Sequence, residues 1–119
     1  MESMSKPFKY IDLFAGCGGL SLGLEAAGFE LELAVEKSDM AAETFYHNLI
    51  NRIPSKKFWD DYTSEKNSIE VQSKNKLIVK ELRELLDNKN LLDSFKVNFF
   101  APSLITKEVL KLMKKIEYM

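Results

Sequence analysis

Two short apolar segments separated by a helical pattern lie near the start of the chain. Residues 8–14, FKYIDLF, are rich in aromatic and branched side chains and stop at small residues, as a buried strand does. Residues 29–35, FELELAV, alternate apolar and acidic residues before an apolar end, which also indicates a strand. Between them, residues 20–28 repeat apolar side chains at helical spacing, and Gly28 is a suitable residue to end that helix.

A second helical pattern follows the second strand. Residues 38–50 begin with Ser38 and Asp39, which are both of residue types that cap helix amino ends, and continue with apolar side chains at helical spacing. The order strand–helix–strand–helix predicts an α/β fold with a parallel sheet and right-handed crossovers.

The middle of the chain has a weaker pattern. Residues 51–75 are polar and interrupted by Pro54, so we expect them to be loop-rich with one short turn. Residues 76–88 predict an amphipathic helix, and we expect residues 76–119 to be mainly helical. The apolar stripe of the amphipathic helix consists of Ile78, Leu82, Leu85 and Leu86.

Two further elements are expected near the carboxyl end. Residues 95–101, FKVNFFA, predict a third strand that Pro102 stops, and residues 103–119 predict a final helix. We expect residues 1–7 to be a loose leader and residues 8–119 to form a single α/β domain.

Composition and charge narrow the class of protein. The 119 residues carry a net charge of −1, so no overall basic surface indicates nucleic-acid binding. A single cysteine cannot form an internal disulfide, which fits the reducing cytoplasm. The amino-terminal residues lack the apolar core of a signal peptide, and no apolar run reaches the roughly 18 residues that span a bilayer. We therefore expect a soluble cytoplasmic protein with no membrane partner.

The segment between the first strand and the first helix carries the candidate chemistry. Gly16, Gly18 and Gly19 permit unusual backbone angles and the close approach of a ligand. The helix that follows offers free N–H groups and the positive end of its dipole to an anionic or carboxylate group. Glu36 ends the second strand, 20 positions after Gly16, where an acidic side chain can accept hydrogen bonds from both hydroxyls of a ribose. This combination predicts a site for a nucleotide-like cofactor.

The same pattern allows two other interpretations. A dinucleotide-binding loop uses an equivalent acidic residue, but its third small residue would fall on Ser21, which is a loose match. The glycines would otherwise simply form a tight strand-to-helix turn, as they do in many α/β domains.

The glycine loop belongs to a longer stretch, DLFAGCGGLSLGLEAAGF from residue 12, and Glu36 belongs to a second, AVEKSDMAAETFYHN from residue 34. Together, over residues 9–51, they closely resemble the amino-terminal segment of the DNA cytosine-5 methyltransferases, which include enzymes of restriction–modification systems. The resemblance implies a partial Rossmann-like fold of the S-adenosylmethionine-dependent methyltransferases. It also implies methyl transfer to C5 of cytosine in DNA by the complete enzyme.

The resemblance implies roles for the loop and for the end of the second strand. Phe14 would contact the adenosine moiety of S-adenosylmethionine, the backbone of Gly16–Leu20 would hold its methionine end, and Glu36 would accept its ribose hydroxyls. Lys37 falls where many relatives place a larger apolar or aromatic side chain against adenine, so this chain departs from the family pattern there. The implied cofactor-binding residues are Phe14, Ala15, Gly16, Cys17, Gly18, Gly19, Leu20, Glu36 and Lys37.

Of the family's remaining functional residues, one has two candidate positions in this chain and the others do not occur in it. Its next acidic cofactor contact would fall on Asp60 or Asp61. The family attacks C6 of a flipped-out cytosine with the cysteine of a Pro-Cys-Gln loop, assisted by a Glu-Asn-Val segment, and neither motif occurs here. From Val97 onward the resemblance ends. We therefore expect no catalytic residue and no activity from this chain alone, as for a truncated, split or frameshifted gene or an expressed fragment.

An incomplete domain of this kind would expose apolar sheet faces and an unpaired edge. We therefore expect a homo-oligomer or a complementary methyltransferase subunit, with DNA reached only through that separate half. The alternatives are a non-catalytic module that binds the cofactor or a partner chain, and a nicotinamide-dinucleotide module, which the loop spacing disfavours.

Several other side chains have ordinary structural explanations. Cys17 lies in a different loop from the family's nucleophile, so we interpret it as a loop residue. His47 has no second base in a catalytic frame and is expected to be a capping or solvated histidine, and no spacing suggests a metal site. Trp59 and Tyr62 are expected to pin their segment to the core. A solvated basic face is expected on the last helix, formed by Lys107, Lys111, Lys114 and Lys115.

Overall fold

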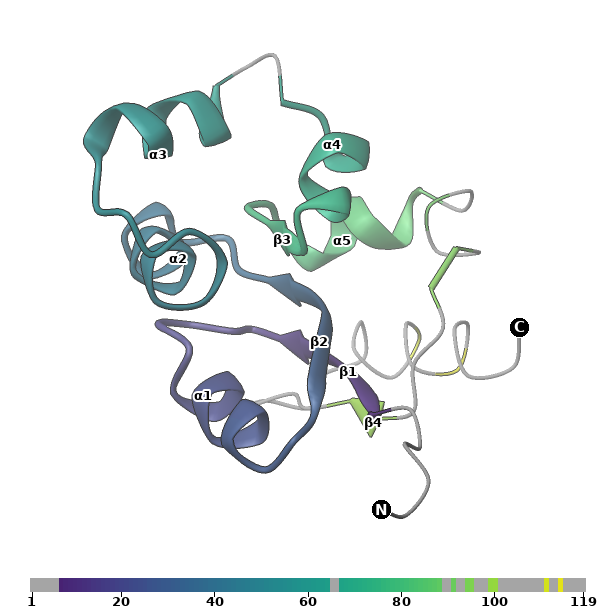
Figure 1. The fold of residues 1–119 in the computed structure, drawn as a ribbon. Coiled ribbons are helices and arrows are strands. Elements are labelled where there is room, and N and C mark those ends of the chain that lie inside the picture. Colours follow the sequence, from purple (N-terminus) through teal and green to yellow (C-terminus); the bar gives the residue numbers. More distant parts are fainter. Residues whose placement is uncertain are drawn as a thin grey trace.

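The computed structural model of the chain describes residues 7–64, 67–88, 91, 94–95, 99–100, 111 and 114. At its centre is a sheet of four strands in the order β3-β2-β1-β4, and each pair of neighbours is parallel (Figure 1). The strands are β1 (Lys9–Leu13), β2 (Glu30–Val35), β3 (Leu77–Ile78) and β4 (Phe99–Phe100). The predicted α/β fold with a parallel sheet is therefore confirmed.

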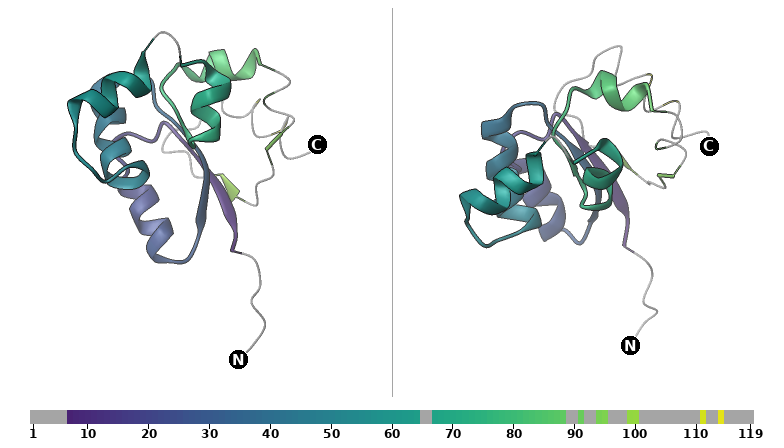
Figure 2. Two further views of the ribbon diagram at one scale, coloured as in Figure 1. Left: turned by 45° about the horizontal axis from the view of Figure 1, so that its top comes forward. Right: turned by 90° about the horizontal axis from the view of Figure 1, so that it is seen from above.

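Both faces of the sheet are covered by helices, as is usual for parallel sheets. In β1, Tyr10 belongs to one apolar cluster, whereas Ile11 and Leu13 belong to a second cluster on the opposite face. Helices α1 and α2 cover the Tyr10 face, and α5 covers the other (Figure 2). Their bounds are Gly19–Ala26 for α1, Asp39–Phe45 for α2 and Leu82–Leu86 for α5.

β2 does not keep the simple alternation of its sequence. Tyr10 pairs with Leu31 and Ile11 pairs with Leu33, so Glu32 is an extra residue in β2 at this point. Leu31 therefore packs in the same cluster as Tyr10, whereas Leu33 packs in the opposite cluster with Ile11. The irregularity buries apolar side chains of β2 on both faces of the sheet.

α1 ends at the predicted glycine. Gly28 has φ 93°, and its N–H donates to the carbonyl of Glu25 at 2.9 Å. The N–H of Phe29 donates to the carbonyl of Leu24, also at 2.9 Å. This pair of bonds is the Schellman motif, which a glycine in the left-handed region completes without steric cost.

The second predicted helix is present but changes its winding. Ser38 caps α2, with its Oγ accepting a hydrogen bond from the N–H of Ala41 at 3.4 Å. Directly after α2, Tyr46–Ile50 form a π-helix, η1. π-helical turns are rare and occur often at functional sites, and this one packs against the glycine loop described below.

The prediction of a loop-rich segment at residues 51–75 is wrong, because the segment contains the helices α3 (Lys56–Thr63) and α4 (Ile69–Lys74). Ser55 caps α3 and Ser68 caps α4, and each hydroxyl accepts a hydrogen bond at 3.3 Å from the N–H three residues later. The polar composition reflects helices that bury few residues each.

Two aromatic residues hold α3 against the core. The Trp59 side chain is buried and stacks on Tyr62 with ring centroids 6.0 Å apart, and it also contacts Tyr46. The Tyr62 hydroxyl donates to the carbonyl of Leu77 at 2.6 Å. The expectation that Trp59 and Tyr62 pin this segment to the core is confirmed.

The amphipathic helix predicted at residues 76–88 is present only in part. Its first residues form β3 beside β2, and helical structure is confined to α5. Lys76, at φ 71°, turns the chain between α4 and β3. Ile78, Leu82 and Leu85 nevertheless pack in one cluster, so the apolar stripe is shared between a strand and a helix.

Only part of the carboxyl-terminal prediction lies within the described residues. β4 occupies two residues of the strand predicted at 95–101. Of the helix predicted at 103–119, Lys111 and Lys114 are described, and both are helical and exposed. The rest of that helix, the other lysines of its basic face and nearly all of the 1–7 leader lie outside the described residues. No helix among the described residues is long and apolar enough to cross a bilayer.

Candidate functional site

The loop between β1 and α1 has three residues in the left-handed region of backbone space. They are Phe14 at φ 56°, Gly16 at φ 60° and Gly18 at φ 100°. Glycine adopts these angles freely, whereas a bulky residue does so at a cost of about 1–3 kcal/mol. Such strain persists only where the surroundings impose it, and it concentrates at binding sites.

This loop lies where parallel sheets commonly bind ligands. The strand order places β2 and β3 on one side of β1 and β4 on the other, so the order reverses at β1. Connections that leave neighbouring strands in opposite directions open a crevice at the carboxyl ends of those strands. The glycine loop follows β1 and Glu36 follows β2, so both lie at this edge.

Glu36 joins the ends of these two strands. Its Oε1 accepts a hydrogen bond from the N–H of Gly16 at 2.8 Å, and its Oε2 accepts one from the N–H of Ser38 at 2.8 Å. The structure therefore brings together two predicted site residues that are 20 positions apart. A carboxylate has about four acceptor positions, so each oxygen keeps one for a further donor.

Asp12 ties the loop from its other side, although the sequence pattern does not single this residue out. Its Oδ2 accepts a hydrogen bond from Ser21 Oγ at 2.5 Å, and the side chains of both residues are buried. Burial raises the pKa of Asp12 from 3.8 to about 6, the Ser21 hydrogen bond opposes this rise, and the charge of Glu36 adds to it. An acidic residue inside an otherwise apolar strand was the available signal.

Gly18 is required by packing as well as by its backbone angle. A Cβ atom at this position would lie 2.7 Å from Leu49 Cδ1 and 3.1 Å from Phe45 Cδ2. Asn48, which is also in η1, donates from Nδ2 to the carbonyl of Cys17 at 3.4 Å. Helix α2 and the π-helix therefore support this part of the loop closely.

Gly16 and Gly19 lie on a more open side of the loop. A Cβ atom on either would meet no atom of the described chain within 4 Å. Within the described residues no side chain caps α1, so the first N–H groups of this helix are available to a ligand. The loop thus has one packed side and one side that a ligand can approach.

Phe14 lines a small cavity at the same edge of the sheet. The cavity has a volume of about 20 Å³, which is room for about one water molecule, and Val35 and Lys37 line it as well. Lys80 and Leu82, which follow β3, complete its wall. The structure therefore brings two predicted site residues, Phe14 and Lys37, close to the end of β3. The sequence pattern predicts a helix in place of β3.

Cys17 and His47 make only structural contacts among the described residues. The Cys17 side chain is exposed, and the loop is held through its carbonyl. His47 Nδ1 lies 3.2 Å from the carbonyl oxygen of Asn51, which can only accept, so Nδ1 carries the proton. His47 therefore caps the carboxyl end of the π-helix, which confirms the expectation of a capping histidine.

Asp60 and Asp61 lie on α3 and pair with lysines of the same helix. Asp60 Oδ1 lies 3.3 Å from Lys56 Nζ, and Asp61 Oδ2 lies 2.9 Å from Lys57 Nζ. All four side chains are exposed. The recorded contacts of these two acids therefore do not connect them to the glycine loop.

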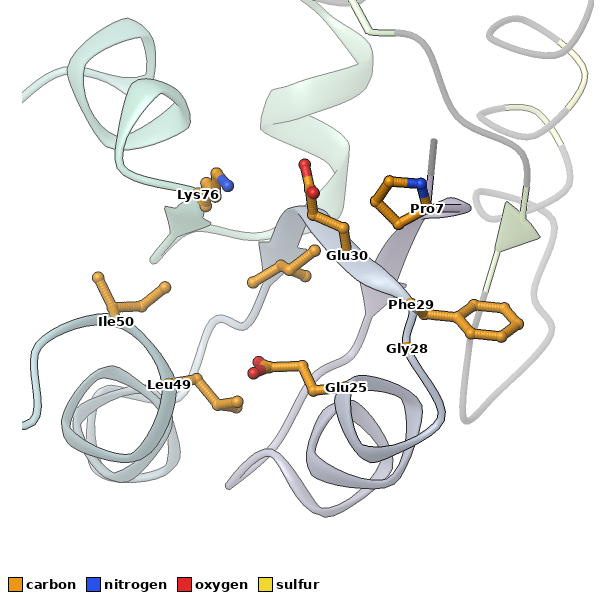
Figure 3. Close-up of a pocket in the computed structure, with 9 residues that line it drawn as sticks. Pro7, Glu25, Gly28, Phe29, Glu30, Leu49, Ile50 and Lys76 are labelled. Carbon is orange, nitrogen blue, oxygen red and sulfur yellow. The ribbon is translucent and has the colours of Figure 1, made fainter. Parts of the chain in front are cut away.

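A larger cavity, of about 420 Å³, lies at the opposite ends of the strands (Figure 3). It is bounded by the segment from Gly28 to Leu31, where β2 begins, and by Lys76, which precedes β3. The carboxylate of Glu25 points into this space from α1. Because ligands of such sheets bind at the carboxyl ends of the strands, this cavity is not the candidate site.

Several DNA methyltransferases are similar to this chain over part of its length. The chain is 44% identical over 62 residues to the Type II methyltransferase M.HindV of Haemophilus influenzae, covering 52% of this chain and 19% of that protein. It is 53% identical over 45 residues to M.HgiGI of Herpetosiphon aurantiacus, covering 38% and 36%. It is 51% identical over 39 residues to DNA (cytosine-5)-methyltransferase 3 of Arabidopsis thaliana, covering 32% and 3%. The chain thus spans only a minor part of the length of these relatives.

The family model for C-5 cytosine-specific DNA methylases matches residues 8–79. The match includes the glycine loop and Glu36 and continues through α3, α4 and β3, so it extends beyond the resemblance recognised over 9–51. It covers more than half of the 119 residues. The matched segment also contains the residues that meet at the carboxyl ends of β1 and β2. Because the family model matches more than half of the chain, this chain belongs to the family of C-5 cytosine-specific DNA methylases.

Proposed function

We propose that this chain is the S-adenosylmethionine-binding part of a methyltransferase that acts on C5 of cytosine in DNA. The observation that carries the proposal is the 2.8 Å contact between Glu36 and the N–H of Gly16, which joins the acidic residue to the glycine loop. S-Adenosylmethionine supplies the methyl group when it is bound. The residues of this chain bind and orient it.

The chemistry of the loop fits this cofactor. Glu36 keeps one acceptor position on each oxygen, and a ribose presents two hydroxyls to such an acid. The open space at Gly16 and Gly19 and the uncapped N–H groups of α1 suit the carboxylate of the methionine end. The proposed cofactor-binding residues are Phe14, Ala15, Gly16, Cys17, Gly18, Gly19, Leu20, Glu36 and Lys37.

The nucleophile and the DNA-recognition region of such an enzyme would lie outside these 119 residues. The matched segments cover 19% of M.HindV and 36% of M.HgiGI, and no Pro-Cys pair occurs in these 119 residues. The side chain of Met40, which is 82% exposed, and that of Ile53, which is 62% exposed, offer apolar surface to a partner. A homo-oligomer or a complementary methyltransferase subunit is therefore proposed, in the cytoplasm, where the lone cysteine stays reduced.

Isothermal titration calorimetry tests the cofactor assignment. Wild-type protein is expected to bind S-adenosylmethionine and its demethylated product but not NAD. Glu36→Gln places an amide against the N–H groups of Gly16 and Ser38 and should weaken binding by about tenfold or more. Glu30→Gln, at the opposite end of β2, is the matched control and should bind as wild type does. Absence of heat with every ligand would overturn the proposal.

A complementation assay tests whether the catalytic nucleophile lies outside these 119 residues. Methyl transfer to cytosine in duplex DNA is expected only when a second polypeptide carrying a Pro-Cys-Gln loop is added. Activity from these 119 residues alone would contradict the assignment of the nucleophile to a region outside them. Cofactor binding without activity in the presence of such polypeptides would instead indicate a non-catalytic cofactor-binding module.

A further inference from the structure

Asp12 is a buried acid beside the proposed cofactor site that none of the proposed contacts uses. It lies in β1, and its carboxylate accepts the 2.5 Å hydrogen bond from Ser21 in the first turn of α1. Relative exposure is 1% for Asp12 and 0% for Ser21. Because the glycine loop is the connection between these two residues, their hydrogen bond closes the loop at its base.

The surroundings of Asp12 do not favour a carboxylate. Burying an ionised acid is unfavourable unless a cation or several hydrogen bonds compensate it. The titratable groups that act on Asp12 or on which it acts are Glu36, beyond the end of β2, and Tyr10, in β1 itself. Ser21, from α1, is neutral, and no cation is among the recorded partners of Asp12 in the described residues. The position of Asp12 is therefore better explained by its role in fixing the glycine loop than by a contribution to the stability of the fold.

Two carboxylates therefore set the geometry of one loop. Asp12 closes the base, while Glu36 holds the N–H of Gly16 near its middle. The hydroxyl of Tyr10 adds a longer contact, at 3.5 Å, to the carbonyl of Ser21. Without the Asp12 bond, this longer contact would be the remaining side-chain hydrogen bond recorded between β1 and the first turn of α1 in the described residues.

We propose that the hydrogen bond between Asp12 and Ser21 is a clasp that sets the glycine loop in the conformation that binds S-adenosylmethionine, with Asp12 acting as a positioning residue. This inference rests on the proposed function. The bond is charge-assisted only while Asp12 is ionised, and charge-assisted bonds are roughly twice as strong as neutral ones. Since the pKa of Asp12 is raised to about 6, cofactor affinity should fall as the pH is lowered through that value.

Calorimetric titration of S-adenosylmethionine between about pH 8 and about pH 5 tests the clasp in wild type, Asp12→Asn and Ser21→Ala. Both variants should bind about tenfold more weakly than wild type at the upper pH, because a hydrogen bond to a charged group is lost. Asp12→Asn should also lack the part of the wild-type pH profile that falls near pH 6. The control is Ser73→Ala, which removes a hydroxyl that bonds a main-chain carbonyl in α4, and it should change neither quantity.

Amide hydrogen exchange of the ligand-free protein gives a second measurement. The Gly16 amide, which donates to Glu36, should exchange faster in both clasp variants than in wild type. Asparagine keeps the shape of Asp12, so this variant retains the fold if Ser21→Ala does not. If both clasp variants keep the wild-type cofactor affinity, pH profile and Gly16 amide exchange, the clasp is overturned and the proposed function is not. Failure of the wild type to bind the cofactor would overturn the proposed function, and unchanged Gly16 exchange would then overturn the clasp as well.

Discussion

Replacing Asp12 with asparagine should remove a pH-dependent cost from the stability of this fold. Burial raises the pKa of Asp12 from 3.8 to about 6, so the folded chain keeps the proton in a pH range where the unfolded chain has released it. The contribution of Asp12 to the free energy of unfolding therefore falls as the pH rises from about 4 to about 6. A pKa change of this size corresponds to about 3 kcal/mol, a large share of the roughly 5–15 kcal/mol that stabilises a typical domain.

Urea unfolding of wild type and Asp12→Asn at a series of pH values measures this contribution. The free energy of unfolding of the variant, minus that of wild type, should increase by about 2.5 kcal/mol between about pH 4 and about pH 7. A constant offset would reflect packing of the amide and is not part of the prediction. In a Ser21→Ala background the increase should be larger, because the Ser21 hydrogen bond lowers the pKa of Asp12. A difference that is independent of pH, or that decreases, would refute the reasoning.

Three further predictions concern packing and the loop. Gly18→Ala should lower the free energy of unfolding by about 2–4 kcal/mol, because the new Cβ atom strains the backbone and overlaps neighbouring side chains. Gly19→Ala should lower it by less than about 1 kcal/mol, and equal urea midpoints for the two variants would contradict this prediction. Trp59→Ala should lower it by about 3–5 kcal/mol because a buried aromatic is lost, with the exposed Val71→Ala as a near-neutral control in thermal unfolding. Cys17→Ala should keep wild-type affinity for S-adenosylmethionine in calorimetry, since the loop is held through the Cys17 carbonyl, and about a tenfold loss would show that the thiol takes part.

The candidate site could be predicted from the sequence where its residues sit at fixed places within single elements. The glycine loop follows a strand and precedes a helix, and Glu36 directly follows the next strand, so both were expected at one edge of the sheet. The contact between Gly16 and Glu36 agrees with this. Asp60 and Asp61 illustrate the limit, because no pattern specified which element would carry the next acid toward the site, and both lie on a helix paired with lysines.

The sequence by itself determined the order of strands and helices in the first half of the fold, because the signals for these elements are local. Apolar spacing, the serine cap at Ser38 and the left-handed Gly28 act within one element and its ends. The tertiary structure decided the rest. Whether Leu77 and Ile78 form a strand depends on the free edge of β2, which is supplied by residues more than 40 positions earlier in the chain. The clasp between Asp12 and Ser21 also arises only once α1 packs on β1. Strand pairing and buried side-chain bonds join residues from different elements, so no pattern along a single element specifies them.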